Sequence, residues 1–260
     1  MMDTFTMLPF IKPEIRKAYF LKAFGREEES MAIFSFGACN YNCPYCKRDG
    51  QFKSDGGQIL RARTYSWGEI KAHLDRAVAA GQGVRLSGGD PCMFPKQSLR
   101  IAEYVWGEYG QKISIAHNGS SPALVEELLP YLDYAAIDVK GATDESLARR
   151  AGLKPGRGRV ERTLSVIKTL TAAGVLVDAR TCVFGDTSRE ELLAIRSALL
   201  DVARRNGGIF WTLRKYNEID SCDFVPGDAM LIKTYAEELA TPELKVGFRD
   251  KWTGATFSIF

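Results

Sequence analysis

The feature that most constrains the fold is a repeated order in which a short apolar segment is followed by a stretch with helical spacing. The intervening stretches are amphipathic, as in the series Ile70, Leu74 and Ala77. Six apolar segments are short enough to be strands and lie at residues 31–36, 83–86, 112–116, 134–139, 175–183 and 209–213. Strands that alternate with helices predict an α/β fold around a parallel sheet with right-handed crossovers. The pattern alone fits a partial barrel, a full barrel or an open doubly wound sheet.

Local signals mark where the helices begin and end. The segments Ser66 to Glu69 and Ser188 to Glu191 have the pattern of a capping box, in which a serine and a glutamate satisfy each other's backbone amides. Gly174 and the pair Gly207-Gly208 follow two of the apolar stripes. Glycine adopts the left-handed conformation that closes a helix, so these positions predict helix ends.

The size and charge of the chain favour a single enzyme domain. It has 260 residues, of which 45% are hydrophobic, enough to bury a large core. The net charge of +3 is a small excess of 35 basic over 32 acidic residues and gives no general argument for nucleic acid. No apolar run approaches the roughly 20 residues that span a bilayer, and residues 1–10 lack a signal-peptide pattern. We therefore expect a cytoplasmic protein without a membrane segment.

Three cysteines in a CxxxCxxC spacing, Cys39, Cys43 and Cys46, follow the first predicted strand. Thiolates are soft ligands that select zinc, copper(I) or iron–sulfur clusters, and a saturated zinc or iron–sulfur site normally has four cysteine or histidine ligands. The next cysteine, Cys92, is far along the chain, and the two histidines are isolated from the motif. The spacing therefore favours an iron–sulfur cluster with one open iron over a structural zinc site that borrows Cys92.

Further polar and glycine-rich segments follow the next two predicted strands. Gly88-Gly89-Asp90 comes after the second strand and His117-Asn118-Gly119 after the third. Two glycines allow the backbone to turn and to approach a ligand closely, and an aspartate accepts hydrogen bonds from an ammonium group. Because the carboxyl ends of parallel strands meet at one edge, we expect the cysteine loop and both segments to lie together.

These motifs resemble those of the radical S-adenosylmethionine (SAM) superfamily. The resemblance rests on the cysteine spacing, on an aromatic residue, Tyr45, before the third cysteine, and on Gly88-Gly89-Asp90, which is similar to the family's GGE motif with Asp in place of Glu. It implies a partial (β/α)6 barrel of the TIM type in which the three cysteines hold a 4Fe–4S cluster and SAM chelates the fourth iron. It also implies that residues 88–90 contact the amino group of SAM and that Tyr45 packs near the adenine.

Other segments resemble one branch, the small single-cluster enzymes that activate glycyl-radical proteins such as pyruvate formate-lyase and anaerobic ribonucleotide reductase. Asp138-Val139-Lys140 is similar to their DLK segment, and Arg180 to their fifth-strand arginine. The resemblance implies that Asp138, Lys140 and Arg180 belong to the SAM site, where the two cations hold the SAM carboxylate. Asn118 is a further SAM contact by resemblance. Pairing of each cation with an ordinary acidic neighbour is the alternative.

The chain also departs from that branch. It lacks their DGPG segment before the cluster and their CHN sequence at the last cysteine, and it has Ala116-His117-Asn118-Gly119 where they show an Asp-Thr-Asn-Gly type of segment. The missing aspartate puts a bound monovalent cation in doubt. No second cysteine cluster exists for an auxiliary iron–sulfur centre. We therefore expect a different partner or substrate.

The resemblance implies that a reduced cluster cleaves SAM into methionine and a 5′-deoxyadenosyl radical, which abstracts hydrogen from a substrate. The target is either the glycyl-radical site of a protein or a small metabolite, a nucleotide or an RNA. A one-electron reductant such as flavodoxin or ferredoxin is the expected partner. No catalytic acid or base is identified. Two interpretations from other classes stay open: an iron–sulfur electron carrier and a zinc-stabilised nucleic-acid-binding protein.

The rest of the chain carries weaker signals. The resemblance covers residues 31–216, the predicted barrel, between an N-terminal extension (1–30) and a C-terminal extension (217–260) that is expected to pack on it. The alternating tail, residues 247–260, predicts a hairpin or an edge strand. Cys182 and Cys222 are expected to be buried or incidental thiols, with a substrate-facing role for either as the alternative. Six basic residues form either a solvated face or a site for a phosphate, an RNA or an acidic partner: Arg149, Arg150, Lys154, Arg157, Arg159 and Arg162.

Overall fold

The computed structural model describes residues 4–8, 16–46, 62–216, 222–250 and 257–260. The centre of its sheet is a run of parallel strands, as the alternating pattern predicted. In spatial order these are β3 (Ser30–Phe36), β5 (Gly83–Gly88), β6 (Ile113–His117), β7 (Leu132–Asp138), β8 (Leu176–Val183), β9 (Ile209–Lys215) and β10 (Lys245–Arg249). The six predicted strands are confirmed, each within two residues at both ends.

Antiparallel strands from the two ends of the chain extend this sheet. β1 (Thr4–Met7) lies between β3 and β4 (Arg63–Ser66), and the short β2 (Arg16–Lys17) also pairs with β3. At the other edge β11 (Phe257–Ile259) pairs antiparallel with β10. The predicted hairpin in the tail is therefore confirmed, although its connection lies outside the described residues. The pairing of β10 with β9 was not foreseen, and the proposed domain boundaries stay a prediction.

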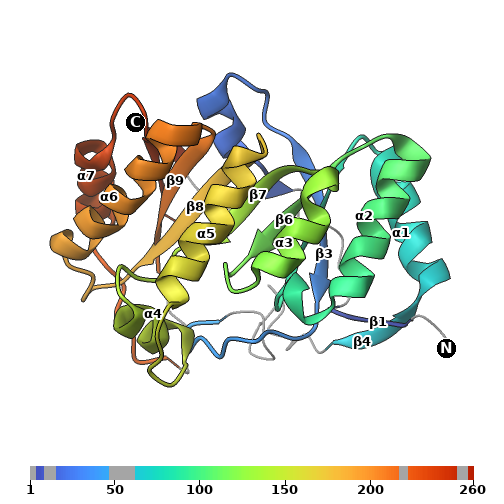
Figure 1. The fold of residues 1–260 in the computed structure, drawn as a ribbon, viewed down its shortest axis with the longest axis horizontal. Coiled ribbons are helices and arrows are strands. Elements are labelled where there is room, and N and C mark those ends of the chain that lie inside the picture. The colour runs from blue at the N-terminus through green and yellow to red at the C-terminus, as the bar shows by residue number, and fades with distance from the viewer. Residues whose placement is uncertain (1–3, 9–15, 47–61, 217–221, 251–256) are drawn as a thin grey trace.

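Seven α-helices lie in the described part of the chain, and all but the fourth cover one face of the curved sheet (Figure 1). They are α1 (Trp67–Ala79), α2 (Pro95–Tyr109), α3 (Pro122–Leu128), α4 (Asp144–Ala151), α5 (Arg159–Ala172), α6 (Arg189–Asn206) and α7 (Ala229–Leu239). Ser66 and Glu69 form the predicted capping box, and the Ser188 side chain accepts a hydrogen bond from the Glu191 amide. None of these helices, within the ranges described, has the length and apolar character needed to cross a bilayer.

The two faces of the sheet differ in what they bury. Alternate strand residues such as Leu86, Ile137 and Val177 pack against the helices in the main hydrophobic core. On the opposite face, Met31, Tyr134 and Phe210 pack against the 3-10 helix η1 (Tyr19–Phe24). The helix η1 therefore closes the concave side of the sheet near the amino ends of these strands.

Further toward the carboxyl ends, the concave face carries polar side chains in place of apolar ones. Asp178, Thr212 and Arg214 alternate with buried apolar residues on strands β8 and β9. Two further 3-10 helices, η2 (Pro91–Met93) and η3 (Leu129–Tyr131), lie in connections of the same α/β units. Polar groups inside a sheet need partners, so this half of the concave face is the place to look for a binding site.

Candidate active site

The cysteine loop leaves the carboxyl end of β3 and is supported by α4. The Asn42 amide donates to the Ala151 carbonyl (2.9 Å), and the Cys46 amide donates to the Cys43 carbonyl (2.9 Å). Tyr41 is buried against α4 together with Leu147. These contacts place all three thiols on one short, partly buried turn.

The surroundings of the thiols fit a metal cluster. The Tyr41 amide donates to Cys39 Sγ (3.4 Å), and Asn118 Nδ2 lies 3.7 Å from the same sulfur. Burial raises the pKa of Cys39 to about 12 and also raises the pKa of Cys43. Iron binds the thiolate form, so a bound cluster supplies the positive charge that such buried sulfurs need. The donor set therefore matches the predicted 4Fe–4S cluster.

The glycine turn at the end of β5 packs directly against the segment that enters the cysteine loop. The Gly89 amide donates to the Phe36 carbonyl (2.7 Å), and the Asp90 amide donates to the Ala38 carbonyl (2.7 Å). Gly88 has a φ of +103°, and a Cβ added at Gly89 would lie 2.0 Å from the Ala38 carbonyl oxygen. The close approach that needs glycine is thus an approach to the chain's own backbone. Contact of this turn with SAM stays a prediction.

Asp90 connects the glycine turn to the loop after β6. Its side chain is buried, its Oδ1 accepts from His117 Nδ1 (2.7 Å), and its Oδ2 accepts from the Asn118 amide (2.8 Å). The Ser121 amide donates to His117 Nε2 (3.1 Å). This bond leaves the imidazole proton on Nδ1, so a neutral His117 satisfies both neighbours. Asp90 therefore holds two loops together.

Asn118 links that loop to the cysteines. Its Nδ2 donates to Asn40 Oδ1 (2.7 Å), and its Oδ1 accepts from the Ser120 amide (3.0 Å). Asn40 in turn donates to Ser120 Oγ (2.8 Å). With the contact to Cys39, Asn118 lies beside one of the predicted cluster ligands. Its contact with SAM is untested.

A partly buried group of charges lies at the carboxyl end of β7. Lys140 Nζ donates to Asp138 Oδ2 (2.9 Å), and Arg214 Nη2 from β9 donates to Asp138 Oδ1 (3.1 Å). Burial disfavours the carboxylate, but Lys140 and Arg214 outweigh it and lower the pKa of Asp138. Lys140 Nζ also lies 3.4 Å from the hydroxyl of Tyr45, so this charge group touches the cysteine loop.

Tyr45 contacts aromatic neighbours as well as Lys140. Its ring packs edge-on against Phe184 with centroids 4.9 Å apart, and Phe224 and Tyr216 complete the group. Burial raises the pKa of the Tyr45 phenol, which keeps its hydroxyl protonated at neutral pH. The predicted position of Tyr45 near the adenine of SAM is untested.

Arg180 lies in register beside Asp138 on the adjacent strand β8. Its Nε donates to Asp178 Oδ2 (2.5 Å), and the other oxygen of Asp178 accepts from Thr212 Oγ1 (2.5 Å). Lys140 and Arg180 are thus close to each other, and each already has an acidic neighbour. Their contact with the carboxylate of SAM remains a prediction.

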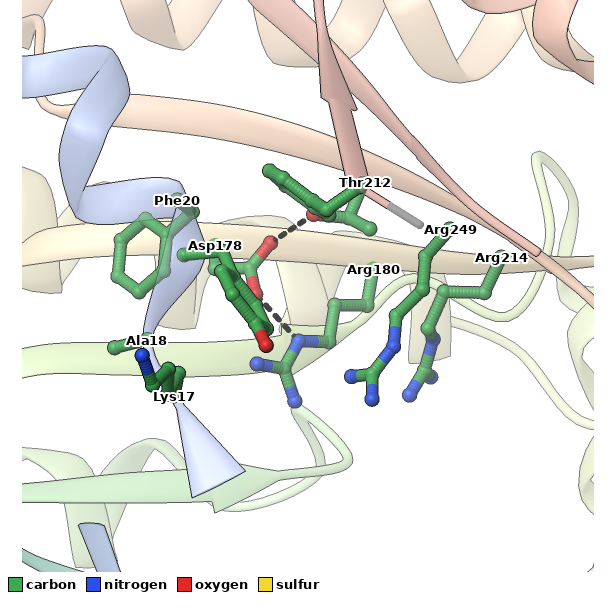
Figure 2. Close-up of a pocket in the computed structure, with 10 residues that line it drawn as sticks. Lys17, Ala18, Phe20, Asp178, Arg180, Thr212, Arg214 and Arg249 are labelled. Carbon is green, nitrogen blue, oxygen red and sulfur yellow. Dashed lines mark hydrogen bonds and ion pairs between the residues drawn. The ribbon is translucent and has the colours of Figure 1, made fainter. Parts of the chain in front are cut away.

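Three residues on the concave face were missed as site candidates by sequence reasoning: Asp178, Arg214 and Arg249. They line a pocket at strands β8, β9 and β10, which Arg180 and Thr212 also line (Figure 2). A usable signal was present, because charged residues alternate with apolar ones in Asp178-Ala179-Arg180 and Leu213-Arg214. In a strand buried on both faces, this alternation marks residues that point into the barrel.

The basic segment between residues 149 and 162 does not form one uniform surface. Arg150 is buried and donates to both carboxylate oxygens of Glu191 (2.9 and 2.6 Å) and to Thr187 Oγ1 (3.1 Å). Arg149 is exposed and pairs with Asp186. Arg150 therefore holds α4 against α6 and is unavailable to a surface ligand.

The remaining cysteines lie in different surroundings. Cys92 lies in η2, where its amide donates to Asp90 Oδ1 (2.9 Å) and its sulfur is 3.8 Å from Ser120 Oγ. Burial raises the pKa of Cys182 on β8 to about 11, which makes it a protonated thiol at neutral pH. Cys222 is partly buried.

The order of these motifs along the strands matches a known family. The family model described as "Radical SAM superfamily" matches residues 33–198, which contain the cysteine loop, the glycine turn, Lys140 and Arg180. This chain belongs to the radical SAM superfamily. It is therefore a radical SAM enzyme, and the family uses a 4Fe–4S cluster and SAM. The predicted family, enzyme class and cofactors are confirmed.

Individual relatives agree with this assignment. The chain is 25% identical to the 7-carboxy-7-deazaguanine synthase of Methanothermobacter thermautotrophicus over 64% of its own length and 66% of that protein. It is 28% identical to the GTP 3′,8-cyclase of Aeromonas hydrophila over 52% of its own length and 40% of the cyclase. The match thus spans about two thirds of the first relative's length and less than half of the second's.

A solved structure supports the fold. A domain of a pyruvate-formate lyase-activating enzyme from Bacteroides vulgatus superposes with a TM-score of 0.52 at 15% identity, covering 64% of this chain and 98% of that domain. The predicted α/β fold with a partial barrel is confirmed. At this identity the likeness concerns the fold alone.

Proposed function

We propose that this radical SAM enzyme acts on a small molecule and does not activate a glycyl-radical protein. The observation that carries the proposal is the pocket on the concave face. It lies between strands β8 to β10 and helix η1, is partly open to solvent, and is lined by Asp178, Arg180 and Thr212. Sites for small molecules are concave and have a few convergent polar groups.

The position of the pocket supports this proposal. Arg180 lines the pocket and is in register with Asp138, which pairs with Lys140 beside the cysteine loop. A molecule held here would lie next to the residues predicted to bind SAM. Both curated relatives described above are named for small-molecule products or substrates, a carboxy-deazaguanine and GTP. The glycyl-radical alternative rests on the motif resemblance and on a fold likeness at 15% identity.

In this proposal the residues of the site have separate roles. Cys39, Cys43 and Cys46 would hold the cluster, and Lys140 and Arg180 would hold the carboxylate of SAM. When bound, the cluster and SAM supply an electron and a 5′-deoxyadenosyl radical that removes hydrogen from the substrate. Helix η1 closes the base of the barrel with Phe20 and Leu21, which excludes water from one side. A flavodoxin or ferredoxin in the cytoplasm would supply the electron.

The first experiment tests SAM cleavage. The chain is reconstituted anaerobically with iron and sulfide, reduced with dithionite and given SAM, and 5′-deoxyadenosine is measured by chromatography. We expect about four irons per chain and production of 5′-deoxyadenosine. In Cys43→Ala both are expected to be lost because a cluster ligand is missing, whereas Cys222→Ala should retain both. Four irons without SAM cleavage would favour an electron carrier, and zinc without iron a structural zinc protein.

The second experiment tests the substrate class. Small acidic heteroaromatic compounds, with GTP among them, are added to the reconstituted enzyme, and the rate of 5′-deoxyadenosine formation is compared with the rate without them. We expect at least one of them to increase the rate and to acquire a mass change. Formation of a glycyl radical on an added glycyl-radical protein, seen by electron paramagnetic resonance, would contradict the proposal.

A further inference from the structure

Arg150 of α4 is a buried cation whose guanidinium group binds more than its ionic partner. Besides the two carboxylate oxygens of Glu191, it reaches the Thr187 hydroxyl (3.1 Å), and its Nη1 donates to the carbonyl of Lys140 (3.1 Å). Only 3% of the residue is exposed. A buried N–H without an acceptor is costly, and these N–H groups find acceptors in the loop after β7 and in the segment before α6. Arg150 therefore ties three separate parts of the chain to α4.

The bond to the Lys140 carbonyl fixes the backbone of a residue whose side chain is held as well. Lys140 is buried, its Nζ donates to Asp138 Oδ2 (2.9 Å), and the same atom lies 5.6 Å from the centre of the Tyr45 ring. A lysine side chain carries about 2 kcal/mol of rotamer entropy. Because both ends of this side chain are held, its ammonium group is preorganised beside the cysteine loop before any ligand binds.

Thr187 connects the same guanidinium group to the aromatic residues around Tyr45. The Thr187 hydroxyl oxygen accepts from Arg150 and from the Phe184 amide (3.0 Å). Arg150 Cζ lies 5.5 Å from the centre of the Phe184 ring, and that ring packs edge-on against Tyr45. Arg150 thus also fixes the ring against which Tyr45 packs, so the backbone of Lys140 and the ring beneath its ammonium group share one anchor.

The charge of Arg150 is already balanced within the protein. Glu191 binds it through both carboxylate oxygens, so the guanidinium group acts through the geometry of its hydrogen bonds and needs no external anion. A lysine at this position would keep the charge, but one nitrogen cannot reproduce the planar fork that serves Glu191, Thr187 and the Lys140 carbonyl together. This difference makes Arg150→Lys a specific probe of the geometry.

We propose that Arg150 is a positioning residue for SAM binding, which fixes the backbone of Lys140 and, through Thr187, the aromatic neighbour of Tyr45. The inference rests on the proposed function, in which Lys140 holds the carboxylate of SAM. Arg150 itself does not touch SAM in this proposal. It sets the place where the ammonium group of Lys140 meets the ligand.

The test measures SAM binding to the anaerobically reconstituted enzyme with an oxidised cluster, so that no SAM is cleaved. Equilibrium dialysis with radiolabelled SAM gives the dissociation constant, and iron is determined on the same samples. We expect Arg150→Lys to bind SAM about tenfold or more weakly than wild type while retaining its iron. Arg189→Gln is the matched control, since Arg189 also joins two helices through a glutamate, Glu238 (3.2 Å), but is exposed. Wild-type affinity in an iron-loaded Arg150→Lys would overturn the inference.

Kinetics separate positioning from a purely structural role. Partial unfolding would lower the fraction of enzyme that reacts, and hence kcat per chain, while the folded molecules would keep the wild-type KM for SAM. A displaced Lys140 would instead raise KM for SAM together with the dissociation constant. Formation of 5′-deoxyadenosine by the reduced enzyme at varied SAM concentration measures both parameters. A lower kcat with unchanged KM in Arg150→Lys would mean that Arg150 is structural only.

Thr187→Val is a milder variant for the case in which Arg150→Lys does not fold or take up iron. It removes the hydroxyl that joins Arg150 to the Phe184 amide and leaves the Arg150–Glu191 pair in place. We expect the SAM dissociation constant to rise about threefold to tenfold, with wild-type iron content. Unchanged affinity in Thr187→Val would then overturn the inference.

Failure of this inference is distinguishable from failure of the proposed function. Lys140→Gln is measured in the same dialysis experiment. Weaker SAM binding in Lys140→Gln with wild-type binding in Arg150→Lys would overturn only the role of Arg150. Wild-type SAM binding in Lys140→Gln would overturn the role that the proposed function gives to Lys140, whichever result the Arg150 variant shows.

Discussion

Three carboxylates, the buried Asp90 and Asp178 and the partly buried Asp138, each use both oxygens to hold at least two neighbours. Charges that have left water are stabilised only when every partner is present. Removal of one member leaves an uncompensated group in a low-dielectric interior. At the residue scale the site is therefore a set of mutually dependent ions, which makes single substitutions informative.

Asp138→Asn tests this dependence. The neutral side chain would leave the buried Lys140 and the partly buried Arg214 without their shared counter-charge, so we expect the free energy of unfolding to fall by about 1–3 kcal/mol. Asp201→Asn is the control because Asp201 forms an exposed pair with Arg205 and should change stability by less than about 1 kcal/mol. Urea unfolding of the apo chains at pH 7 measures both. Similar losses in the two variants would contradict the charge-network interpretation.

The same carboxylate predicts an acid dependence. Although burial opposes the charge, Lys140 and Arg214 lower the pKa of Asp138 below its ordinary value of 3.8. Its contribution is therefore complete above the unfolded-state pKa and is lost as the pH falls toward the lower folded-state pKa. The stability difference between wild type and Asp138→Asn should be constant near neutrality and narrow below about pH 4. Urea titrations from pH 7 to acid follow this, and a difference that widens in acid would reverse the assigned sign.

At the scale of elements, α4 positions the cysteine loop. The helix ends at Gly152, which has a φ of +61°, and a Cβ added there would lie 1.8 Å from the Asn42 carbonyl oxygen. Arg150 on the same helix is bound to Glu191 of α6. Because Arg150 fixes α4 to α6, the cysteine loop packs against a helix that has little freedom to move.

Gly152→Ala and Gly174→Ala form a matched pair that tests this support. Both glycines have positive φ values, +61° and +77°, but Gly174 has nothing within 4 Å of an added Cβ. Each substitution should cost about 1–2 kcal/mol in backbone strain. Only Gly152→Ala should also displace the loop and lower the iron bound per chain after reconstitution. Iron content measured by colorimetric assay decides this, and full iron loading in Gly152→Ala would mean that α4 does not position the ligands.

At the scale of the whole molecule, helix η1 from the first part of the chain meets strand β11 from its last part on the concave side of the sheet. Phe257 of β11 stacks on Tyr19 of η1 and contacts Phe210 of β9, with centroids 5.7 and 5.9 Å apart. Lys245 Nζ donates to the Ala23 carbonyl (2.6 Å). The N-terminal helix and the C-terminal hairpin thus close the base of the barrel together and form the aromatic wall of its pocket.

Phe257→Ala should weaken this closure. Loss of the ring contacts is expected to lower the free energy of unfolding by about 1–3 kcal/mol. Ile259→Ala, on the same strand but exposed, should change it by less than about 0.5 kcal/mol. Thermal and urea unfolding of the reconstituted enzyme compare the two. Equal effects would indicate that β11 is held by backbone pairing and that the aromatic contacts add little.

The strands and the helix boundaries were largely predictable because they depend on local patterns. Apolar runs of strand length, the Ser66 capping box and the glycines at helix ends each act over a few neighbouring residues. The parallel strand β10 was not predicted as such, since its place beside β9 depends on which sheet edge is free. The sequence predicted a contact with SAM for Asp90 and the glycine turn, whereas the structure shows the hydrogen bonds that they form within the chain. Their partners are His117, Asn118 and the backbone before Cys39, none of which is a neighbour in sequence.

The sequence by itself determined the family and the cofactors and predicted the three cluster ligands, because a CxxxCxxC spacing places three thiols close together along the chain. Only the tertiary structure decided that Arg180, Arg214 and Arg249 lie side by side on neighbouring strands (Figure 2) and line one pocket with aromatic side chains of η1 and β11. Their separation in sequence carries no information about distance. Sheet register and burial of the apolar faces bring them together, and both are properties of the whole folded chain.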